Sequence, residues 1–147
     1  MPLNIFWSDD RPEQTAFWRE KLEKLSHNVD DFKRLPEATI SVLKKEYDIY
    51  LIDILQPMGR KLIPELSVHL SHLKLGSRTE LGGLALARYI KSIKPNASVV
   101  IVTNQKELAD QLLKEIPSIV CRVKNSTDFS IDYIIKTATD GKQKSNV

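Results

Sequence analysis

Cysteine is nearly absent from this chain of 147 residues, which carries a single one at position 121. One cysteine cannot form a disulfide within the chain, and it cannot supply the several thiolates of a Cys-rich zinc site. The 5 glycines and 7 prolines are too few for a collagen-like or low-complexity sequence. We therefore expect a globular domain from a reducing compartment.

Long apolar runs are missing as well. No run approaches the roughly 20 residues that a membrane-spanning helix needs. The first residues, MPLNIFWSDD, lack the basic-then-apolar layout of a secretion signal. These absences predict a cytoplasmic protein without membrane insertion.

The chain also has little excess charge of either sign. Its net charge of +3 is small and dispersed, which does not favour nucleic acid as a direct partner. Hydrophobic residues make up 41% and charged residues 28%, a balance that opposes disorder. A chain of this length folds as one unit that buries roughly 68–70% of its unfolded surface. We predict a single domain over residues 1–139, followed by a flexible tail over residues 140–147.

Short apolar runs alternate with amphipathic stretches along the chain, which is typical of repeated strand–helix units. The apolar runs predict strands over residues 3–7, 29–32, 48–54, 98–102 and 119–123. Three- and four-residue spacing predicts helices after Pro12 and over residues 36–45, 81–94 and 106–115. A last helix is predicted from a cap at Thr127 or Asp128 to about Ala138. Five such units indicate an α/β fold, a doubly wound parallel sheet with helices on both faces.

The same spacing predicts which face of each helix is buried. The residues expected to pack inward are Phe17, Trp18, Leu22 and Leu25 in the first helix and Ala38, Val42 and Leu43 in the second. Together with the strands, these side chains form part of the predicted core.

One segment does not fit the alternation of strands and helices. Residues 60–80 lie between the third strand and the next regular helix, and connections longer than about 12–15 residues are uncommon in compact domains. Within this segment, helical spacing relates Leu62, Leu66, Leu70 and Leu73. We predict an inserted helix over residues 64–74, whose leucines pack either on the domain or on a partner.

Polar residues stand at the carboxyl ends of four predicted strands. Asp9 and Asp10 follow the first strand, Asp53 the third, Thr103 the fourth and Lys124 the fifth. Ligands bind at this edge of an open parallel sheet, where neighbouring strands lie about 4.8 Å apart. If the first and third strands are neighbours, the three aspartates form a cluster whose mutual repulsion favours a bound cation, and Mg²⁺ suits these ligands. A carboxylate there can act as a nucleophile and form an acyl phosphate.

These residues, with two further motifs, resemble the receiver domains of two-component response regulators. The motifs are Asp9-Asp10, Asp53 with Pro57 four positions later, Gly82-Gly83-Leu84 at the start of a helix, Thr103 and Lys124. The resemblance covers about residues 3–138 apart from the insertion. It implies a flavodoxin-like (CheY-like) five-stranded parallel sheet of order 2-1-3-4-5. The helical insertion predicted from the leucine spacing falls between the third strand and the third helix of this fold.

The resemblance also implies a role for each site residue. Asp53 would be the phosphoacceptor, and Thr103 and Lys124 would contact its phosphoryl group. The ligands implied for Mg²⁺ are Asp10 directly, Asp9 mainly through water, Asp53, and the backbone carbonyl of Leu55. The phosphoryl donor would be a sensor histidine kinase or a histidine phosphotransfer protein. We expect a stand-alone response regulator that is not an enzyme in its own right and signals by protein–protein contact.

The sequence departs from the receiver pattern at three positions. Arg11 stands where receivers usually carry an acidic residue, Cys121 replaces an aromatic switch residue, and Asn125 replaces a proline. These departures leave a second interpretation open, a receiver-like interaction module that phosphorylation does not regulate. A third interpretation, a phosphohydrolase that uses Asp53 as its nucleophile, is opposed by Leu55. Haloacid-dehalogenase-type enzymes place a second aspartate at that position.

Overall fold

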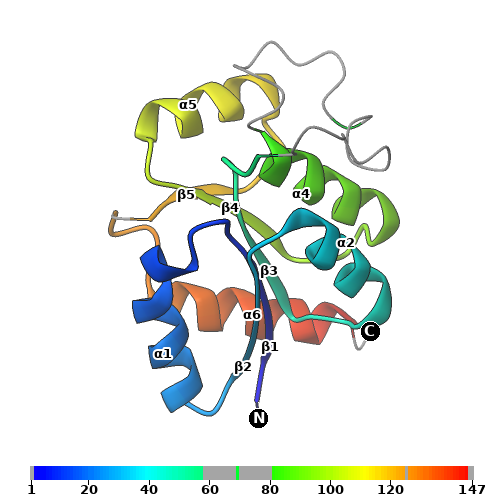
Figure 1. Cartoon of the computed structure of the whole chain (residues 1–147), viewed down its shortest axis with the longest axis vertical. Helices are drawn as coiled ribbons and strands as arrows, with labels where there is room; N and C mark the ends of the chain where they lie inside the picture. Colours follow the sequence, from blue (N-terminus) through cyan, green and yellow to red (C-terminus); the bar gives the residue numbers. More distant parts are fainter. Residues whose placement is uncertain (1, 58–68, 70–80, 125, 146–147) are drawn as a thin grey trace.

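The computed structural model describes residues 2–57, 69, 81–124 and 126–145, and the inserted helix predicted over residues 64–74 lies outside them apart from residue 69. Five parallel strands form one sheet of order β2-β1-β3-β4-β5, as predicted (Figure 1). The strands are β1 (Asn4–Ser8), β2 (Asn28–Phe32), β3 (Ile49–Asp53), β4 (Val99–Thr103) and β5 (Cys121–Val123).

Helices cover both faces of this sheet. The helical elements are η1 (Pro12–Gln14), α1 (Ala16–Lys24), α2 (Leu35–Lys44), α4 (Gly82–Ile93), α5 (Lys106–Glu115) and α6 (Ile131–Ser145). One apolar core joins α1 and α6 to the sheet, and a second core joins α2, α4 and α5 to the opposite face. The predicted doubly wound α/β architecture is confirmed. None of the helices in the described residues is both long and apolar enough to cross a bilayer.

The central strands supply both cores because successive side chains of a strand point to opposite faces of the sheet. In β1, Phe6 faces the α2–α4–α5 core, whereas Ile5 and Trp7 face the α1–α6 core. β3 divides in the same way, with Tyr50 on one side and Leu51 on the other. A strand that is buried on both faces reads as a nearly continuous apolar run, which is why the sequence marks these strands clearly.

Two predicted helix faces are wrong in part. Leu22 of α1 is fully buried, but Phe17 is 59% exposed and Leu25 is 54% exposed. In α2, Leu43 is 67% exposed while Ala38 and Val42 are buried. The strip of each helix that contacts the sheet is narrower than the apolar face of that helix. The apolar side chains at the margins of the face therefore remain in solvent.

The last helix differs from its prediction at both ends. Its cap is Ser130, whose Oγ accepts a hydrogen bond from the Tyr133 N–H at 3.1 Å, rather than Thr127 or Asp128. The helix continues to Ser145, so the predicted flexible tail over residues 140–147 is helical over 140–145. Gly141 permits this extension, because a Cβ there would lie 2.4 Å from the carbonyl oxygen of Asp48. Lys142 adds a hydrogen bond from its Nζ to the carbonyl of Pro2.

Candidate functional site

Strand register places the predicted site residues at one edge of the sheet. Ser8, the last residue of β1, pairs with Ile52 of β3, and Asp53 pairs with Val102 of β4. The Lys124 N–H donates to the carbonyl of Thr103 at 2.9 Å, which sets the end of β5 beside the end of β4. The turns that follow β1, β3, β4 and β5 therefore open on a common edge.

A buried lysine joins two of the predicted aspartates. The Nζ of Lys124 lies 3.1 Å from Oδ2 of Asp9 and 2.5 Å from Oδ2 of Asp53. The side chains of Lys124 and Asp9 are 1% and 3% exposed, and that of Asp53 is 13% exposed. Charge-assisted hydrogen bonds in such dry surroundings are stronger than exposed ion pairs. Asp53 is the most accessible member of this triad.

Backbone N–H groups hold the remaining oxygen of each carboxylate. Oδ1 of Asp9 accepts from the Arg11 N–H at 2.8 Å, and Oδ1 of Asp53 accepts from the Leu55 N–H at 3.0 Å. Both are bonds from an aspartate to the residue two positions later, which is the local pairing that aspartate favours in turns. They fix the orientation of both carboxylates.

Thr103 is oriented by the same type of turn. Its Oγ1 accepts from the Gln105 N–H at 3.1 Å, and the residue is 1% exposed. The hydroxyl thus sits at the end of β4 beside the backbone of Lys124.

The ionisation of the site reflects burial and an excess of carboxylates. Burial raises the pKa of Asp53, and the Lys124 ammonium opposes that rise. Burial alone would lower the pKa of Lys124, but its contacts with Asp53 and Asp9 outweigh burial and raise the pKa. Burial and the neighbouring Asp9 also raise the pKa of Asp10, against the charges of Arg11 and Lys124. The Lys124 ammonium therefore interacts with the carboxylates of all three aspartates.

Mg²⁺ is the cofactor that the receiver resemblance implies, and the donor atoms at this edge of the sheet suit the ion. The available ligands are oxygen atoms, which Mg²⁺ prefers. Burial raises the pKa of Asp10, and the charge of Asp9, which adds to that rise, is charge that a divalent cation would offset. In the described part of the chain, no group of three or more His, Cys, Asp or Glu side chains is arranged to hold a metal ion. In this arrangement the ammonium of Lys124 serves as the cation between Asp9 and Asp53.

Sequence reasoning missed Gln56 and Ser8, which join the ends of β1 and β3. Gln56 is 1% exposed, and its Nε2 donates to the carbonyl of Ser8 at 2.9 Å and to that of Asp53 at 2.8 Å. Its Oε1 accepts from Ser8 Oγ at 2.9 Å. The only available signal was a polar residue directly before the Asp9-Asp10 pair, where the rest of the strand is apolar.

Gly83 lets α4 begin directly against the end of β3. A Cβ at this position would lie 1.7 Å from the carbonyl oxygen of Asp53, so only glycine fits. The N–H groups of Gly82 and Gly83 donate to the carbonyls of Gln56 and Ile54, at 2.9 and 3.2 Å. The Gly82-Gly83 motif thus positions the turn that carries Asp53.

The structure brings together Asp9, Asp53 and Lys124 by direct contact and Thr103 through its backbone. Asp10 acts on the same edge through its charge, since Asp9 and Lys124 both shift its pKa. Cys121, at the position of the expected switch, is 4% exposed in the α2–α4–α5 core. Asn125 lies outside the described residues.

A parallel sheet of this order, with an acidic pair after β1, an aspartate after β3 and a lysine after β5, defines the class: the chain has the fold of response regulator receiver domains. A receiver domain protein from Clostridium thermocellum is similar over 98% of this chain and 97% of its own, with a TM-score of 0.66 and 16% identity.

Two further solved structures carry ligands. The response regulator TrrA from Thermotoga maritima, in complex with Mg²⁺-BeF, matches 94% of this chain and 99% of its own at a TM-score of 0.63 and 18% identity. A response regulator protein from Burkholderia pseudomallei, with a phosphorylated aspartic acid, a calcium ion and citrate, matches 97% of this chain and 72% of its own at a TM-score of 0.58 and 16% identity. No family model and no curated protein matches the sequence.

Proposed function

We propose that the chain is a cytoplasmic response regulator receiver that accepts a phosphoryl group on Asp53 in a Mg²⁺-dependent phosphorelay. The observation that carries this proposal is the buried Lys124 ammonium, bonded to both Asp9 and Asp53. A structural ion pair would need one carboxylate, whereas here a second and more exposed carboxylate, that of Asp53, shares the same ammonium. In this role the domain assists its own phosphorylation and is not an enzyme that acts on a separate substrate.

The proposed transfer forms one bond and breaks one bond. An Oδ atom of Asp53 attacks the phosphorus of a phosphohistidine, and the electron pair of the P–N bond returns to the imidazole as it leaves. Lys124 keeps its proton throughout, because contacts with the carboxylates raise its pKa, and it pairs with the transferred oxygens. The Thr103 hydroxyl donates to another phosphoryl oxygen.

Asp10, Asp53 and the carbonyl of Leu55 would hold Mg²⁺ directly, with Asp9 acting through water. When bound, the ion supplies positive charge to the phosphoryl oxygens. Burial raises the pKa of Asp10 and the charge of Asp9 adds to that rise, and a bound cation would offset the part due to Asp9, which supports this assignment. The TrrA complex with Mg²⁺-BeF supports it by analogy of fold.

The phosphoryl donor needs a surface on which to dock, and an apolar groove between α1 and α6 is suitable. This cavity of about 640 Å³ is lined by the exposed Phe17 and Leu25, by Trp18 and by Ile131. Both helices begin after strands that end at the site, so a donor seated here approaches Asp53. We assign this surface to a sensor histidine kinase or a histidine phosphotransfer protein.

The test is phosphorylation in solution. The protein is incubated with Mg²⁺ and acetyl phosphate and its intact mass is measured, with Asp53→Asn as the matched control. We expect a mass gain of one phosphoryl group that requires both Mg²⁺ and Asp53. Absence of this gain under all conditions, in protein shown to be folded, would overturn the proposal.

A second candidate function is a receiver-like interaction module that phosphorylation does not regulate. The same lysine favours it, because an ammonium that already neutralises Asp9 and Asp53 can serve a purely structural purpose. The buried Cys121 in place of an aromatic switch residue points the same way. Titration with Mg²⁺ separates the two functions, since only the phosphoacceptor requires binding that Asp10→Asn abolishes.

A further inference from the structure

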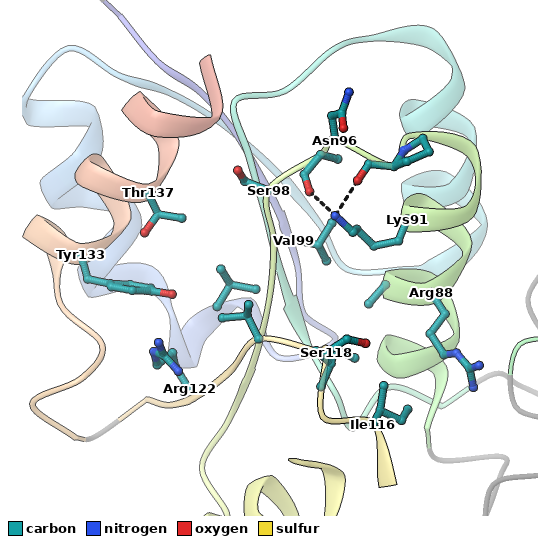
Figure 2. Close-up of a pocket in the computed structure, with 16 residues that line it drawn as sticks. Arg88, Lys91, Asn96, Ser98, Val99, Ile116, Ser118, Arg122, Tyr133 and Thr137 are labelled. Carbon is teal, nitrogen blue, oxygen red and sulfur yellow. Dashed lines mark hydrogen bonds between the residues drawn. The ribbon is translucent and has the colours of Figure 1, made fainter. Parts of the chain in front are cut away.

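A groove opens at the edge of the sheet where β5 is shorter than β4. Its cavity of about 880 Å³ lies between α4 and α6, and residues 95–100 cross its floor (Figure 2). It lies at the beginning of β4, whereas Asp53 and Lys124 stand where the strands end. The groove is therefore separate from the proposed phosphoacceptor site.

The floor of the groove is an unpaired length of sheet edge. β5 pairs only with Ile101–Thr103 of β4, so no described strand lies beside the first part of β4. The Ile101 N–H points toward β5 and donates to the Val120 carbonyl at 2.9 Å, while the Ser98 carbonyl points toward β3 and accepts from Tyr50. Because these directions alternate along a strand, the N–H and C=O of Val99 face the groove.

The walls of the groove carry positive charge only. Lys91 on the α4 side and Arg122 on the α6 side face the groove, whereas the Arg88 guanidinium on α4 points away from it (Figure 2), and no Asp or Glu is among the described lining residues. Arg88 donates to the carbonyl of His69, and Lys91 donates to those of Pro95 and Ala97. Arg122 donates to the carbonyl of Cys121 and lies over the Tyr133 ring. In the described part of the chain, none of the three cations forms an ion pair with a carboxylate.

We propose that this groove binds an extended acidic peptide segment of a partner protein, which adds to the free edge of β4. The cations lie on opposite walls, so a single small anion would contact one wall and leave the other unmatched (Figure 2). A strand seated on the floor presents its alternate side chains to the two walls and its own amides to Val99. Nucleic acid offers the charge but not the backbone pairing.

The probe is a synthetic peptide of alternating glutamate and valine, labelled with fluorescein. Its binding to the whole protein is followed by fluorescence anisotropy, with a peptide of alternating lysine and valine as the matched control. We expect saturable binding of the glutamate peptide only. The binding weakens as salt shortens the Debye length from about 10 Å at 0.1 M to about 3 Å at 1 M.

Charge reversal locates the binding surface. Arg122→Glu should weaken binding of the glutamate peptide about tenfold. The exposed Lys33 follows β2, which β1 and β3 separate from β4, so Lys33→Glu changes the net charge equally and should have no effect. Asp53→Asn should bind like the wild-type protein, so the result is independent of phosphorylation and of the proposed function.

Amide chemical shifts give a readout that does not depend on any variant. On addition of the glutamate peptide to ¹⁵N-labelled wild-type protein, the Val99 amide should shift more than those of β2. The proposal is overturned if the lysine peptide binds equally well, if Val99 does not respond, or if an oligonucleotide binds more tightly than the peptide and shifts the same amides.

Discussion

At the scale of single residues, the buried amide of Gln56 sets the spacing between two carboxylates of the candidate site. It is hydrogen-bonded to Ser8 at the end of β1 and to the carbonyl of Asp53 at the end of β3. Asp9 follows Ser8 directly, so these bonds also position the two aspartates that share Lys124. Buried amides with all their partners present specify one arrangement of the chain, because any alternative leaves polar atoms unpaired.

Gln56→Leu should destabilise the protein by about 2 kcal/mol, because it leaves the Ser8 hydroxyl and two backbone carbonyls unpaired. Unfolding in urea measures this loss. Ser8→Ala in the Gln56→Leu background should cost less than Ser8→Ala in the wild-type protein, since its partner is already gone. Equal costs in the two backgrounds would contradict the coupling.

Cys121 is a second buried residue whose chemistry follows from its surroundings. Burial raises the pKa of its thiol to about 11, so the reactive thiolate is rare at neutral pH. We expect iodoacetamide to modify the native protein slowly at about pH 8 and the urea-unfolded protein rapidly. Mass spectrometry over time distinguishes the two. Equal rates in native and unfolded protein would show that Cys121 is accessible.

At the scale of elements, the start of α4 is built around the turn that carries Asp53. The N–H groups of Gly82 and Gly83 donate to carbonyls of that turn, and the turn lies so close to residue 83 that a side chain there would not fit. This contact couples the position of a helix to the position of the proposed phosphoacceptor. Displacement of α4 along the sheet would therefore move Asp53 as well.

Gly83→Ala and Gly141→Ala form a pair that separates stability from chemistry. Both introduce a Cβ that would collide with a carbonyl oxygen, that of Asp53 in the first case and that of Asp48 in the second. We expect both to lower the free energy of unfolding, but only Gly83→Ala should also slow phosphorylation of the fraction that remains folded. Equal phosphorylation rates of the two folded variants would contradict this coupling.

Most elements follow from the sequence, because a strand buried on both faces is apolar throughout and a helix repeats its apolar residues every three or four positions. The carboxyl-edge residues Asp9, Asp53 and Lys124 were predictable for the same reason, once the strands were in place. The exposure of Phe17, Leu25 and Leu43 was not, since spacing marks the apolar side of a helix but not the width of sheet beneath it. The pairing of Gln56 with Ser8 depends on contact across 48 positions and has no local signal.

At the scale of the whole molecule, acidic charge is concentrated where the strands end, and the groove of cationic side chains lies where β4 begins. The apolar cores between these regions supply most of the stability, and the acidic edge opposes it. Raised pKa values of Asp10 and Asp53 express this conflict, because the folded protein favours their protonated forms. Binding of a cation or of a phosphorylated partner would change how strongly the acidic edge opposes folding.

Asp10→Asn should raise the melting temperature in metal-free buffer at neutral pH. The pKa of Asp10 is raised in the folded state, so its ionisation destabilises the protein above the unfolded pKa of 3.8, and the advantage of the variant should vanish as pH falls below that value. Thermal melts at several pH values measure this difference. Added Mg²⁺ should raise the melting temperature of the wild-type protein but not that of Asp10→Asn. A variant less stable than the wild type at neutral pH would contradict the proposed repulsion.

Because Lys124 contacts two carboxylates, the protein itself supplies a positive charge that balances its acidic edge. Because this positive charge is tethered to β5, assembly of the acidic edge can proceed without recruiting an ion from solution. A chelator that removes Mg²⁺ should then prevent the proposed phosphorylation without unfolding the protein. A zinc finger differs, because it unfolds when its metal is removed. Under the proposed function, such a domain stays folded when Mg²⁺ is scarce and becomes competent for phosphorylation when the ion returns.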